Sequence, residues 1–420
     1  MSASTKFTET WRLRAGFAAA LSRMYAAEVP AYTTLVDVAT AINRDHAGDE
    51  RLGSLNRVTA ERHGAIRVGS VRELADVADL FAAFGMYPVG YYDLREAASP
   101  VPVVSTAFRP IDADELARNP FRVFTSMLAT ADPRFFPDAL RARVERFVGE
   151  RRLFDPVLIA DARRIAEAGG AEADVAHRFV ERATAAFALS REPIDKGWYD
   201  ELSDVSPVAA DIAGVSSTHI NHLTPRVLDI DELNRRMTAR GITMIDAIQG
   251  PPRWNGPDVL LRQTSFQALA EPRRFRGPGG TVTDGTLRVR FGEVEARGVA
   301  LTPEGRERYD AAMAFLGQER SDPGKSQPDR AAAWAQHFPA TDGELAAQGL
   351  AYYRGGDPTK PVVYEDFLPA SAAGIFRSNL DSDTAVADGA DPADYSLDWM
   401  AGAIGHHVHD PYDLYEKAGS

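Results

Sequence analysis

The chain has 420 residues, a formal net charge of −13, 45% hydrophobic and 25% charged residues, which is typical of a globular protein. This acidic balance argues against binding to nucleic acid or to an anionic membrane surface, and no apolar run is long enough to span a bilayer. Cysteine is absent, which excludes disulfides, thiolate metal ligands and a cysteine nucleophile, so any metal must bind His, Asp or Glu.

The first part of the chain predicts helices followed by a strand, a helix and two strands. Apolar residues recur at helical spacing over 9–44, and charged residues interrupt the N-terminus too often for a signal peptide, so we expect a cytoplasmic protein. "ERHGAIRVGS" predicts an extended segment. "SVRELADVADLFAAFG" predicts a helix with a capping box at Ser70 and Glu73 and an end at Gly85. "MYPVGYYDL" and "VPVVSTAFRP" predict strands.

The middle of the chain changes to amphipathic helical patterns from about 112 to 200 and then returns to strands. "STHINHLTPRV" is expected to be extended and "DIDELNRRMTARG" helical. "TMIDAIQG", "DVLLRQTSFQAL" and "TLRVRFGEVEARG" predict three strands, with "RFRGPGGTVTDG" as a loop between the last two. Beyond 302 we expect mixed helices and loops.

Two stretches resemble each other and indicate an internal repeat. "HGAIRVGSVREL" begins at His63 and "HLTPRVLDIDEL" begins at His222. Without gaps, His63 aligns with His222, and Arg67 aligns with Arg226. Each stretch predicts a strand carrying H-x-x-x-R, then a helix and further strands, and residues two or four apart on a strand share a face. If the two units form one curved sheet, both histidines enter one cleft.

The strand "RVRFGEVEARG" carries two carboxylates on one face, Glu293 and Glu295. A buried carboxylate is costly unless a positive partner compensates it. Two imidazoles and a carboxylate on neighbouring strands form a 2-His-1-carboxylate face, which is typical of non-haem Fe(II) oxygenases. Spacing does not decide between the two glutamates, and the second of them is also a candidate partner for Arg297. Ligand types alone do not exclude Zn, Mn, Co or Ni.

Several segments together resemble one known family. These are "HGAIRVGS", "NHLTPR", "RQTSF", "FGEVEARGVALTP" and "DFLPASAAGIFRSNL", and they resemble the 2-oxoadipate dioxygenase/decarboxylase family, also called D-2-hydroxyglutarate synthase. The resemblance spans roughly residues 10 to 415. It implies a distant branch of the vicinal oxygen chelate fold. It also implies one Fe(II) and the conversion of 2-oxoadipate and O2 to D-2-hydroxyglutarate and CO2 without added reductant.

The resemblance implies a metal site at His63, His222 and Glu293, with Glu295 as the alternate carboxylate. These residues would be both the metal ligands and the catalytic set of a decarboxylating non-haem iron dioxygenase. The expected partners are a small 2-oxo dicarboxylic acid and O2, and the oligomeric state stays open.

The resemblance further implies substrate contacts at three positions. Arg67 would bind the distal carboxylate, for which a planar guanidinium is suited. Ala370 and Ser371 would contact the substrate from the loop "LPASAAGIF". A larger apolar residue is expected at position 370 in the family, so Ala370 leaves the exact substrate chain length open.

The predicted fold class is α+β, with paired β-α-β-β-β modules forming a curved mixed sheet around the metal site, a helical N-terminus and a helical insertion. We expect one elaborated domain over 1–420. Its parts are a first β-α-β module at 60–110, the helical insertion at 112–200, a second module at 215–302, and C-terminal helices and loops that close the site at 303–420.

Three further features receive structural interpretations. His219 has the opposite strand parity to His222, so it is expected to be structural or to support a ligand. Arg226 is expected to form a structural ion pair, and "GHHVHDPYD" over 405–413 is expected to be lid or surface structure. The alternative functions are another metal-dependent enzyme of this fold acting on a different 2-oxo acid (an isomerase, lyase or dioxygenase), and a non-catalytic protein that binds a metal or an organic acid.

Overall fold

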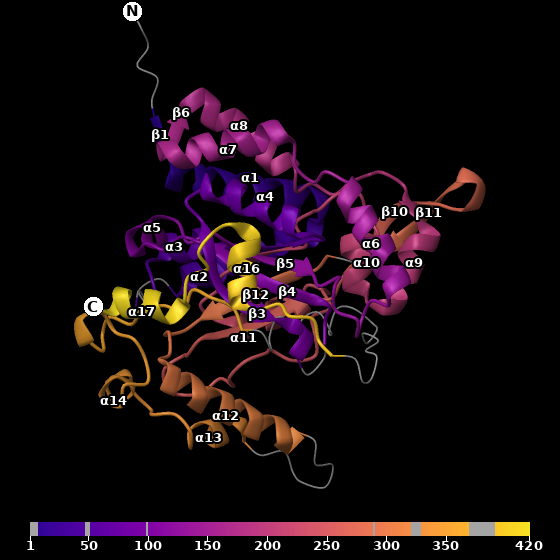
Figure 1. The fold of residues 1–420 in the computed structure, drawn as a ribbon. Coiled ribbons are helices and arrows are strands. Elements are labelled where there is room, and N and C mark those ends of the chain that lie inside the picture. Colours follow the sequence, from indigo (N-terminus) through magenta and orange to yellow (C-terminus); the bar gives the residue numbers. More distant parts are fainter. Residues whose placement is uncertain (1–6, 47–50, 98–99, 289, 321–328, 369–390) are drawn as a thin grey trace, which may run out of the picture.

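The computed structural model describes most of the chain, and Figure 1 shows its arrangement. The described ranges are 7–46, 51–97, 100–288, 290–320, 329–368 and 391–420. Ala370 and Ser371 lie outside them. Within these ranges, none of the helices combines the length and the apolar character needed to cross a bilayer.

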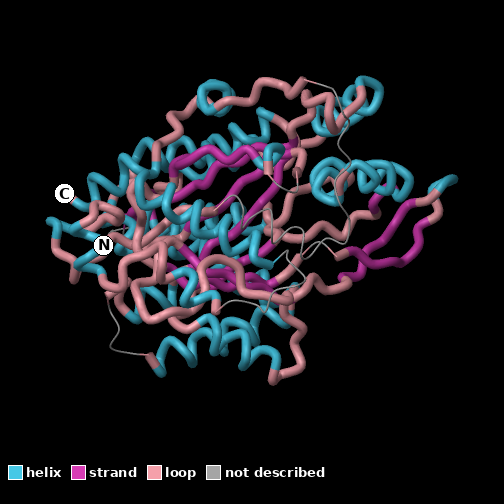
Figure 2. Tube along the Cα trace, turned by 90° about the horizontal axis from the view of Figure 1, so that it is seen from below, coloured by secondary structure: helices cyan, strands magenta, loops and turns pink. Residues whose placement is uncertain are grey.

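A five-stranded sheet forms the centre of the molecule, in the order β3-β4-β5-β2-β8. β2 runs parallel to β5 and antiparallel to β8, whereas β3, β4 and β5 are joined in antiparallel pairs. Figure 2 shows the strands gathered in the interior with helices around them. The strands are β2 (Arg62–Val68), β3 (Tyr87–Asp93), β4 (Val103–Arg109), β5 (Arg122–Leu128) and β8 (His222–Pro225).

A second strand pair continues beyond β8. β9 (Leu261–Phe266) pairs antiparallel with β12 (Gly292–Arg297). A parallel bridge between Arg226 and Glu295 connects the end of β8 to β12, and antiparallel bridges from Met244 and Gln249 lie on the other edge of β9. The strands that carry the predicted ligands are therefore neighbours.

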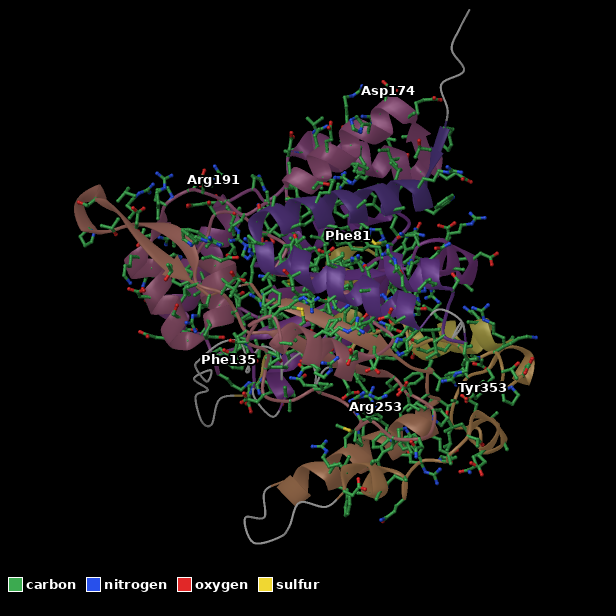
Figure 3. All side chains as sticks on the ribbon, turned by 180° about the vertical axis from the view of Figure 1, so that it is seen from behind. Phe81, Phe135, Asp174, Arg191, Arg253 and Tyr353 are labelled. Carbon is green, nitrogen blue, oxygen red and sulfur yellow. The ribbon has the colours of Figure 1, made fainter. Side chains whose placement is uncertain are left out.

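The two faces of the central sheet differ in character because side chains alternate along each strand. Ile66 and Val68 of β2 point into the main apolar core, which also contains Phe17 of α1 (Thr10–Glu28) and Leu74 of α4 (Val71–Ala82). Figure 3 shows Phe81 of α4 inside this packed region. The opposite face of β2 carries His63, Ala65 and Arg67. The polar side chains of His63 and Arg67 therefore lie away from this core.

The N-terminal helices and the helix after each repeated strand match the sequence patterns. α4 begins after Ser70, whose hydroxyl accepts a hydrogen bond from the Glu73 backbone N at 3.3 Å, and Gly85 follows it with a φ of 65°. The predicted capping box is incomplete, because the Glu73 carboxylate accepts instead from the Gly69 backbone N at 2.6 Å. These helices are α1 (Thr10–Glu28), α2 (Pro30–Asp45), α4 (Val71–Ala82) and α11 (Ile230–Thr238). A further short helix, α3 (Leu55–Ala60), was not predicted.

The segment 112–200 is mostly helical, but it also supplies a central strand that the sequence analysis missed. β5 lies between β2 and β4, and all of its residues are buried. A strand buried on both faces lacks the alternation that distinguishes strands from helices. The helices in this segment and directly after it are α5 (Ala113–Arg118), α6 (Asp138–Glu150), α7 (Pro156–Ala168), α8 (Ala173–Ala185), α9 (Lys196–Val205) and α10 (Pro207–Ala213). The remaining short strands are β1 (Phe7–Glu9), β6 (Gly170–Glu172) and β7 (Ile194–Asp195).

The loop predicted in "RFRGPGGTVTDG" is wrong, because this stretch forms most of a hairpin that projects from the body (Figure 1). β10 (Glu271–Arg276) and β11 (Val282–Leu287) pair antiparallel around Gly279 and Gly280, whose φ values are 73° and 81°. The single strand expected over "TLRVRFGEVEARG" is therefore two, β11 and β12. The strand expected at "TMIDAIQG" is reduced to isolated bridges.

The C-terminal part combines helices with an extended strap. In the 405–413 segment, the His409 backbone N donates to the Pro88 carbonyl at 2.9 Å and extends the edge of β3. Among the described residues, the group that could hold a metal ion is His63, His222 and Glu293; the lid or surface interpretation of the 405–413 segment stays a prediction. The helices are α12 (Pro303–Arg320), α13 (Arg330–Trp334), α14 (Asp342–Ala347), α16 (Leu397–Ile404) and α17 (Pro411–Gly419).

Replacing Gly292 by Ala is expected to destabilise the fold where β12 begins. A Cβ atom at this position would lie 1.7 Å from Cε1 of Phe266 on β9, so the buried Phe266 ring or the strands themselves must shift. Overpacking of this kind costs about 1–3 kcal/mol. The urea midpoint should fall relative to the wild type.

Gly149→Ala in α6 is the matched control, because nothing lies within 4 Å of its added Cβ. Alanine in a helix is favoured over glycine by about 0.5–1 kcal/mol, so this variant should unfold at an equal or higher urea concentration. A wild-type midpoint for Gly292→Ala would contradict the steric argument.

Candidate metal site

Three predicted side chains converge on the polar face of the sheet: His63 of β2, His222 of β8 and Glu293 of β12. Their candidate ligand atoms all lie within 4.8 Å of one another, and all three side chains are buried. The strand register explains the meeting of the histidines. His222 lies opposite Ala65, and Thr224 lies opposite His63, so the imidazoles are diagonal neighbours on one face.

One carboxylate oxygen, Oε2 of Glu293, lies between the two rings. It is 3.0 Å from Nε2 of His63 and 3.2 Å from Nε2 of His222. It also accepts a hydrogen bond from the Thr224 hydroxyl at 3.0 Å. The ring centroids are 5.5 Å apart with an interplanar angle of 86°. Two imidazole nitrogens and a carboxylate therefore face a common point.

The charges around this point suit a cation. Burial lowers the pKa of His222 to about 4, against the opposing effect of Glu293, so its imidazole is neutral at pH 7. Burial also lowers the pKa of His63, but contact with Glu295 and Glu293 outweighs this and raises it. Burial raises the pKa of Glu293, but the two histidines outweigh burial and lower it. An ionised carboxylate and imidazole nitrogens form a donor set that fits a divalent first-row metal.

Glu295 lies next to the trio formed by His63, His222 and Glu293, but its main partner is Arg297. Arg297 contacts both of its oxygens, with Nε at 2.5 Å from Oε1 and Nη2 at 2.9 Å from Oε2. Oε2 also lies 3.1 Å from Nδ1 of His63, on the side of the ring away from the Glu293 contact. Glu293 and Glu295 share a face as predicted, and Glu293 is the one whose oxygen lies among the histidine Nε2 atoms.

Arg67 is buried farther along β2 and is fixed by an ion pair with Asp211 of α10. Asn221 supports the pair by donating to Oδ2 of Asp211 at 2.9 Å, and the Thr218 hydroxyl donates to the Arg67 carbonyl at 2.8 Å. His219 contacts Asn221 at 3.1 Å and lies 3.6 Å from Asp211. His219 is therefore part of the surroundings of Arg67 and not of the His63–His222–Glu293 trio.

Arg226 does not occupy the same environment as Arg67, although the two align in the repeat. Its Nη1 lies 3.0 Å from Glu61, and its Nη2 donates to the Leu52 carbonyl at 2.8 Å. Glu61 also binds Arg122 of β5, which donates to the Glu365 carbonyl at 3.0 Å. The ion pair expected for Arg226 is thus present.

The described segment that ends at Leu368, just before the positions Ala370 and Ser371, is tied to the sheet. Arg297 donates to the carbonyls of Tyr364 and Asp366 at 2.8 and 3.0 Å. The Phe367 ring stands edge-on to His63, with centroids 5.0 Å apart and an interplanar angle of 88°. This segment therefore forms one wall beside the trio.

Sequence reasoning missed three residues at the site: Thr224, Asp211 and Phe367. Thr224 had a usable signal, because a residue two positions after His222 on a strand shares its face. Phe367 stands in the quoted segment "DFLPASAAGIFRSNL", directly before the loop "LPASAAGIF" that the resemblance assigned to substrate. Asp211 had no local signal, since only tertiary packing brings α10 to Arg67.

Comparison with known proteins first defines the class of fold. The chain matches a putative glyoxalase superfamily protein from Ralstonia eutropha JMP134 with a TM-score of 0.53 and 18% identity, over 71% of this chain and 86% of that one. This likeness shows a shared mixed α+β fold. It agrees with the expected fold class at that level.

The particular family follows from closer matches. The family model for 2-oxoadipate dioxygenase/decarboxylase matches residues 17–379. The chain is 71% identical to the 2-oxoadipate dioxygenase/decarboxylase of Mycobacterium tuberculosis, over 98% of this chain and 97% of that protein. It matches the crystal structure of the Pseudomonas putida hydroxyglutarate synthase in complex with 2-oxoadipate with a TM-score of 0.84 and 36% identity, over 99% and 97% of the two chains. The chain belongs to the 2-oxoadipate dioxygenase/decarboxylase family, which confirms the resemblance found in the sequence.

Replacing Asp366 by Asn should destabilise the wall beside the trio. Arg109 donates to its two oxygens at 2.6 and 3.0 Å, and the Tyr415 hydroxyl also donates to it. Removing one partner of a buried ion pair costs about 3–5 kcal/mol because the other charge stays buried and uncompensated. We expect a lower urea midpoint at pH 7.

The effect of Asp366→Asn should shrink in acid. Burial raises the pKa of Asp366, but Arg109 outweighs it and holds the pKa below its ordinary value. Its stabilising effect is therefore present above the unfolded-state pKa of about 4 and is lost as the pH falls. Asp310→Asn, which breaks an exposed pair with Arg306 on α12, is the control and should change stability by less than about 0.5 kcal/mol. Equal midpoints for the two variants at pH 7 would contradict the prediction.

Proposed function

We propose that this protein is an Fe(II)-dependent dioxygenase that decarboxylates 2-oxoadipate and forms D-2-hydroxyglutarate and CO2 with O2. The observation that carries the proposal is the convergence of His63, His222 and Glu293 in a chain of this family. All atoms of 2-oxoadipate and O2 appear in the two products, so the reaction balances without an external reductant. The 2-oxo dicarboxylic acid and O2 are therefore the only small-molecule partners required.

We assign the metal to Nε2 of both histidines and a carboxylate oxygen of Glu293. A 2-His-1-carboxylate set leaves coordination positions open for substrate and O2. Bound Fe(II) would supply O2 activation and Lewis acidity toward the keto group. The convergence of the candidate ligand atoms of all three residues within 4.8 Å of one another supports this assignment.

Substrate orientation is assigned to Arg67 and to the loop at Ala370 and Ser371. Arg67 shares the face of His63 on β2, and its guanidinium geometry suits the distal carboxylate. Its pair with Asp211 supports the role, because the pair fixes the guanidinium before substrate arrives. The wall around Phe367 is expected to exclude water from the reacting end of the substrate.

The repeated arrangement of strands supports a finer description of the fold. We propose that β2-α4-β3-β4-β5 and the chain from β8 through α11 to β12 are two copies of one β-α-β-β-β module within a single domain over 1–420. In both, the first strand is linked in parallel to the last, by β2 with β5 and by the Arg226–Glu295 bridge. The cytoplasmic location stays a prediction.

The proposal predicts oxygen uptake that depends on iron and 2-oxoadipate. After anaerobic reconstitution with Fe(II), O2 consumption and product mass are measured with 2-oxoadipate, 2-oxoglutarate and 4-hydroxyphenylpyruvate. We expect 2-hydroxyglutarate from 2-oxoadipate, and loss of uptake to background in His63→Ala, His222→Ala and Glu293→Ala.

His177→Ala is the control for a histidine replacement, because His177 lies exposed on α8 with 74% of its side chain accessible. It should retain wild-type uptake. Bound iron with no uptake on any of the three acids would reject the dioxygenase and favour an isomerase, a lyase or a binding protein. Turnover of another 2-oxo acid alone would keep the chemistry and reject the assigned substrate.

Arg67→Lys should raise KM for 2-oxoadipate more than for 2-oxohexanoate, which has the same chain length without the distal carboxylate. Lysine keeps the charge but cannot bind both carboxylate oxygens through a planar fork. A hydrogen bond to a charged group contributes about 1.5–3 kcal/mol, so KM should rise roughly tenfold to a hundredfold. Steady-state kinetics on both acids measure the difference.

Arg72→Lys is the matched control, because Arg72 on α4 donates to the Arg151 backbone carbonyl at 2.7 Å and has no part in the proposed site. Its KM values should stay at wild type. An equal rise for the two acids in Arg67→Lys would mean that Arg67 serves only its ion pair with Asp211.

A further inference from the structure

The two histidines of the trio have different surroundings at the nitrogen that faces away from Glu293. Nδ1 of His63 lies 3.1 Å from Oε2 of Glu295. Nδ1 of His222 is buried and has no hydrogen-bond partner among the described residues. Nδ1 of His63 also makes no aligned hydrogen bond with Glu295. The two rings therefore differ in that the carboxylate charge of Glu295 is in contact with His63.

We propose that Glu295 is a positioning residue that orients His63 and strengthens it as a metal ligand, so that the two histidines bind the metal unequally. The inference rests on the proposed metal site at His63, His222 and Glu293. It adds a role for the second carboxylate of the strand and an asymmetry between the two imidazoles.

The first support is the rigidity of Glu295. Arg297 engages both of its oxygens, and Arg297 is itself held by the carbonyls of Tyr364 and Asp366. Both side chains are almost fully buried, at 1% exposure for Glu295 and 2% for Arg297. The carboxylate is therefore fixed in place and cannot swing toward the metal position without breaking a buried ion pair.

The second support is the direction of its effect on the ring. A carboxylate at Nδ1 favours the tautomer that carries its proton there and leaves the lone pair on Nε2, the atom that faces Glu293. Such a partner also raises the basicity of the coordinating nitrogen. Within the described part of the chain, no carboxylate contacts Nδ1 of His222, whose ring is instead packed against Phe291, with centroids 5.3 Å apart.

The test is the affinity of the full-length apoprotein for Co(II), measured by competition with a chromophoric chelator. Glu295→Gln keeps the shape and removes the charge. Loss of a carboxylate that supports a metal-binding histidine typically costs about 10–100-fold in metal affinity, and we expect a weakening in that range.

Glu73→Gln is the control, because it removes the charge from a buried pair of the same geometry. Arg151, which directly follows α6, contacts its two oxygens at 2.7 and 2.9 Å, and no histidine contact is recorded for this pair among the described residues. This variant should bind Co(II) as the wild type does. Circular dichroism and urea midpoints establish that each variant is folded.

A double-mutant cycle tests whether the effect passes through His63. Glu295→Gln should weaken Co(II) binding further in a His222→Gln background but add nothing in a His63→Gln background. Equal losses in both backgrounds would overturn the inference, since Glu295 would then act as a general charge. If Glu295→Gln does not fold, Glu295→Asp, which keeps the charge but withdraws it from Nδ1, should show the same pattern.

The two proposals fail in different ways. Wild-type protein that does not bind Co(II) would overturn the metal site itself, and with it the proposed function. A wild type that binds Co(II) and a folded Glu295→Gln variant with the same affinity would overturn only the role of Glu295.

Discussion

Compensation of buried charge on one face of the sheet is the constraint on which the rest of the structure depends. Glu61 is fully buried and bound by Arg122 and Arg226, and Arg297 is bound by Glu295. An uncompensated buried ion costs several kcal/mol, so these charges are tolerated only when the strands that carry them meet in one register. If the pairing register of one of these strands shifted by one residue, the charged side chains of that strand would point to the apolar face of the sheet. The network thereby fixes where the histidines lie.

The same network connects the sheet to the segment that precedes the predicted substrate loop. Arg109 binds Asp366, and Arg297 binds the carbonyls of Tyr364 and Asp366. These contacts place Phe367 against the ring of His63. Arg297 contacts Glu295 as well, so one guanidinium orients both a carboxylate beside the trio and the wall of the site. A change at Arg297 would therefore alter the site and the wall together.

The sequence predicted the parts of the fold and site that depend on local periodicity. Helix α4 follows from its apolar spacing and the cap at Ser70, and the histidines follow from the repeat. It missed β5, which is buried on both faces and lacks alternation. It also left Glu293 and Glu295 undecided, because equal parity places both on one face. The pair of Glu295 with Arg297 lies within β12 and was a candidate from the sequence, but the approach of Glu293 to the Nε2 atoms of His63 and His222 crosses strands, which a single sequence does not reveal.

The pairing of β2 with β8 explains why a repeated H-x-x-x-R motif yields a site that is not symmetric. The strands are adjacent and antiparallel, with Ala65 opposite His222, so the histidines meet near the middle. Each arginine lies four residues beyond its histidine, roughly 13 Å along an extended strand, and the two strands run in opposite directions. Arg67 consequently reaches Asp211, whereas Arg226 reaches Glu61. Antiparallel pairing thus brings the two histidines together on one face and separates the two arginines, so each arginine finds a different carboxylate as its partner.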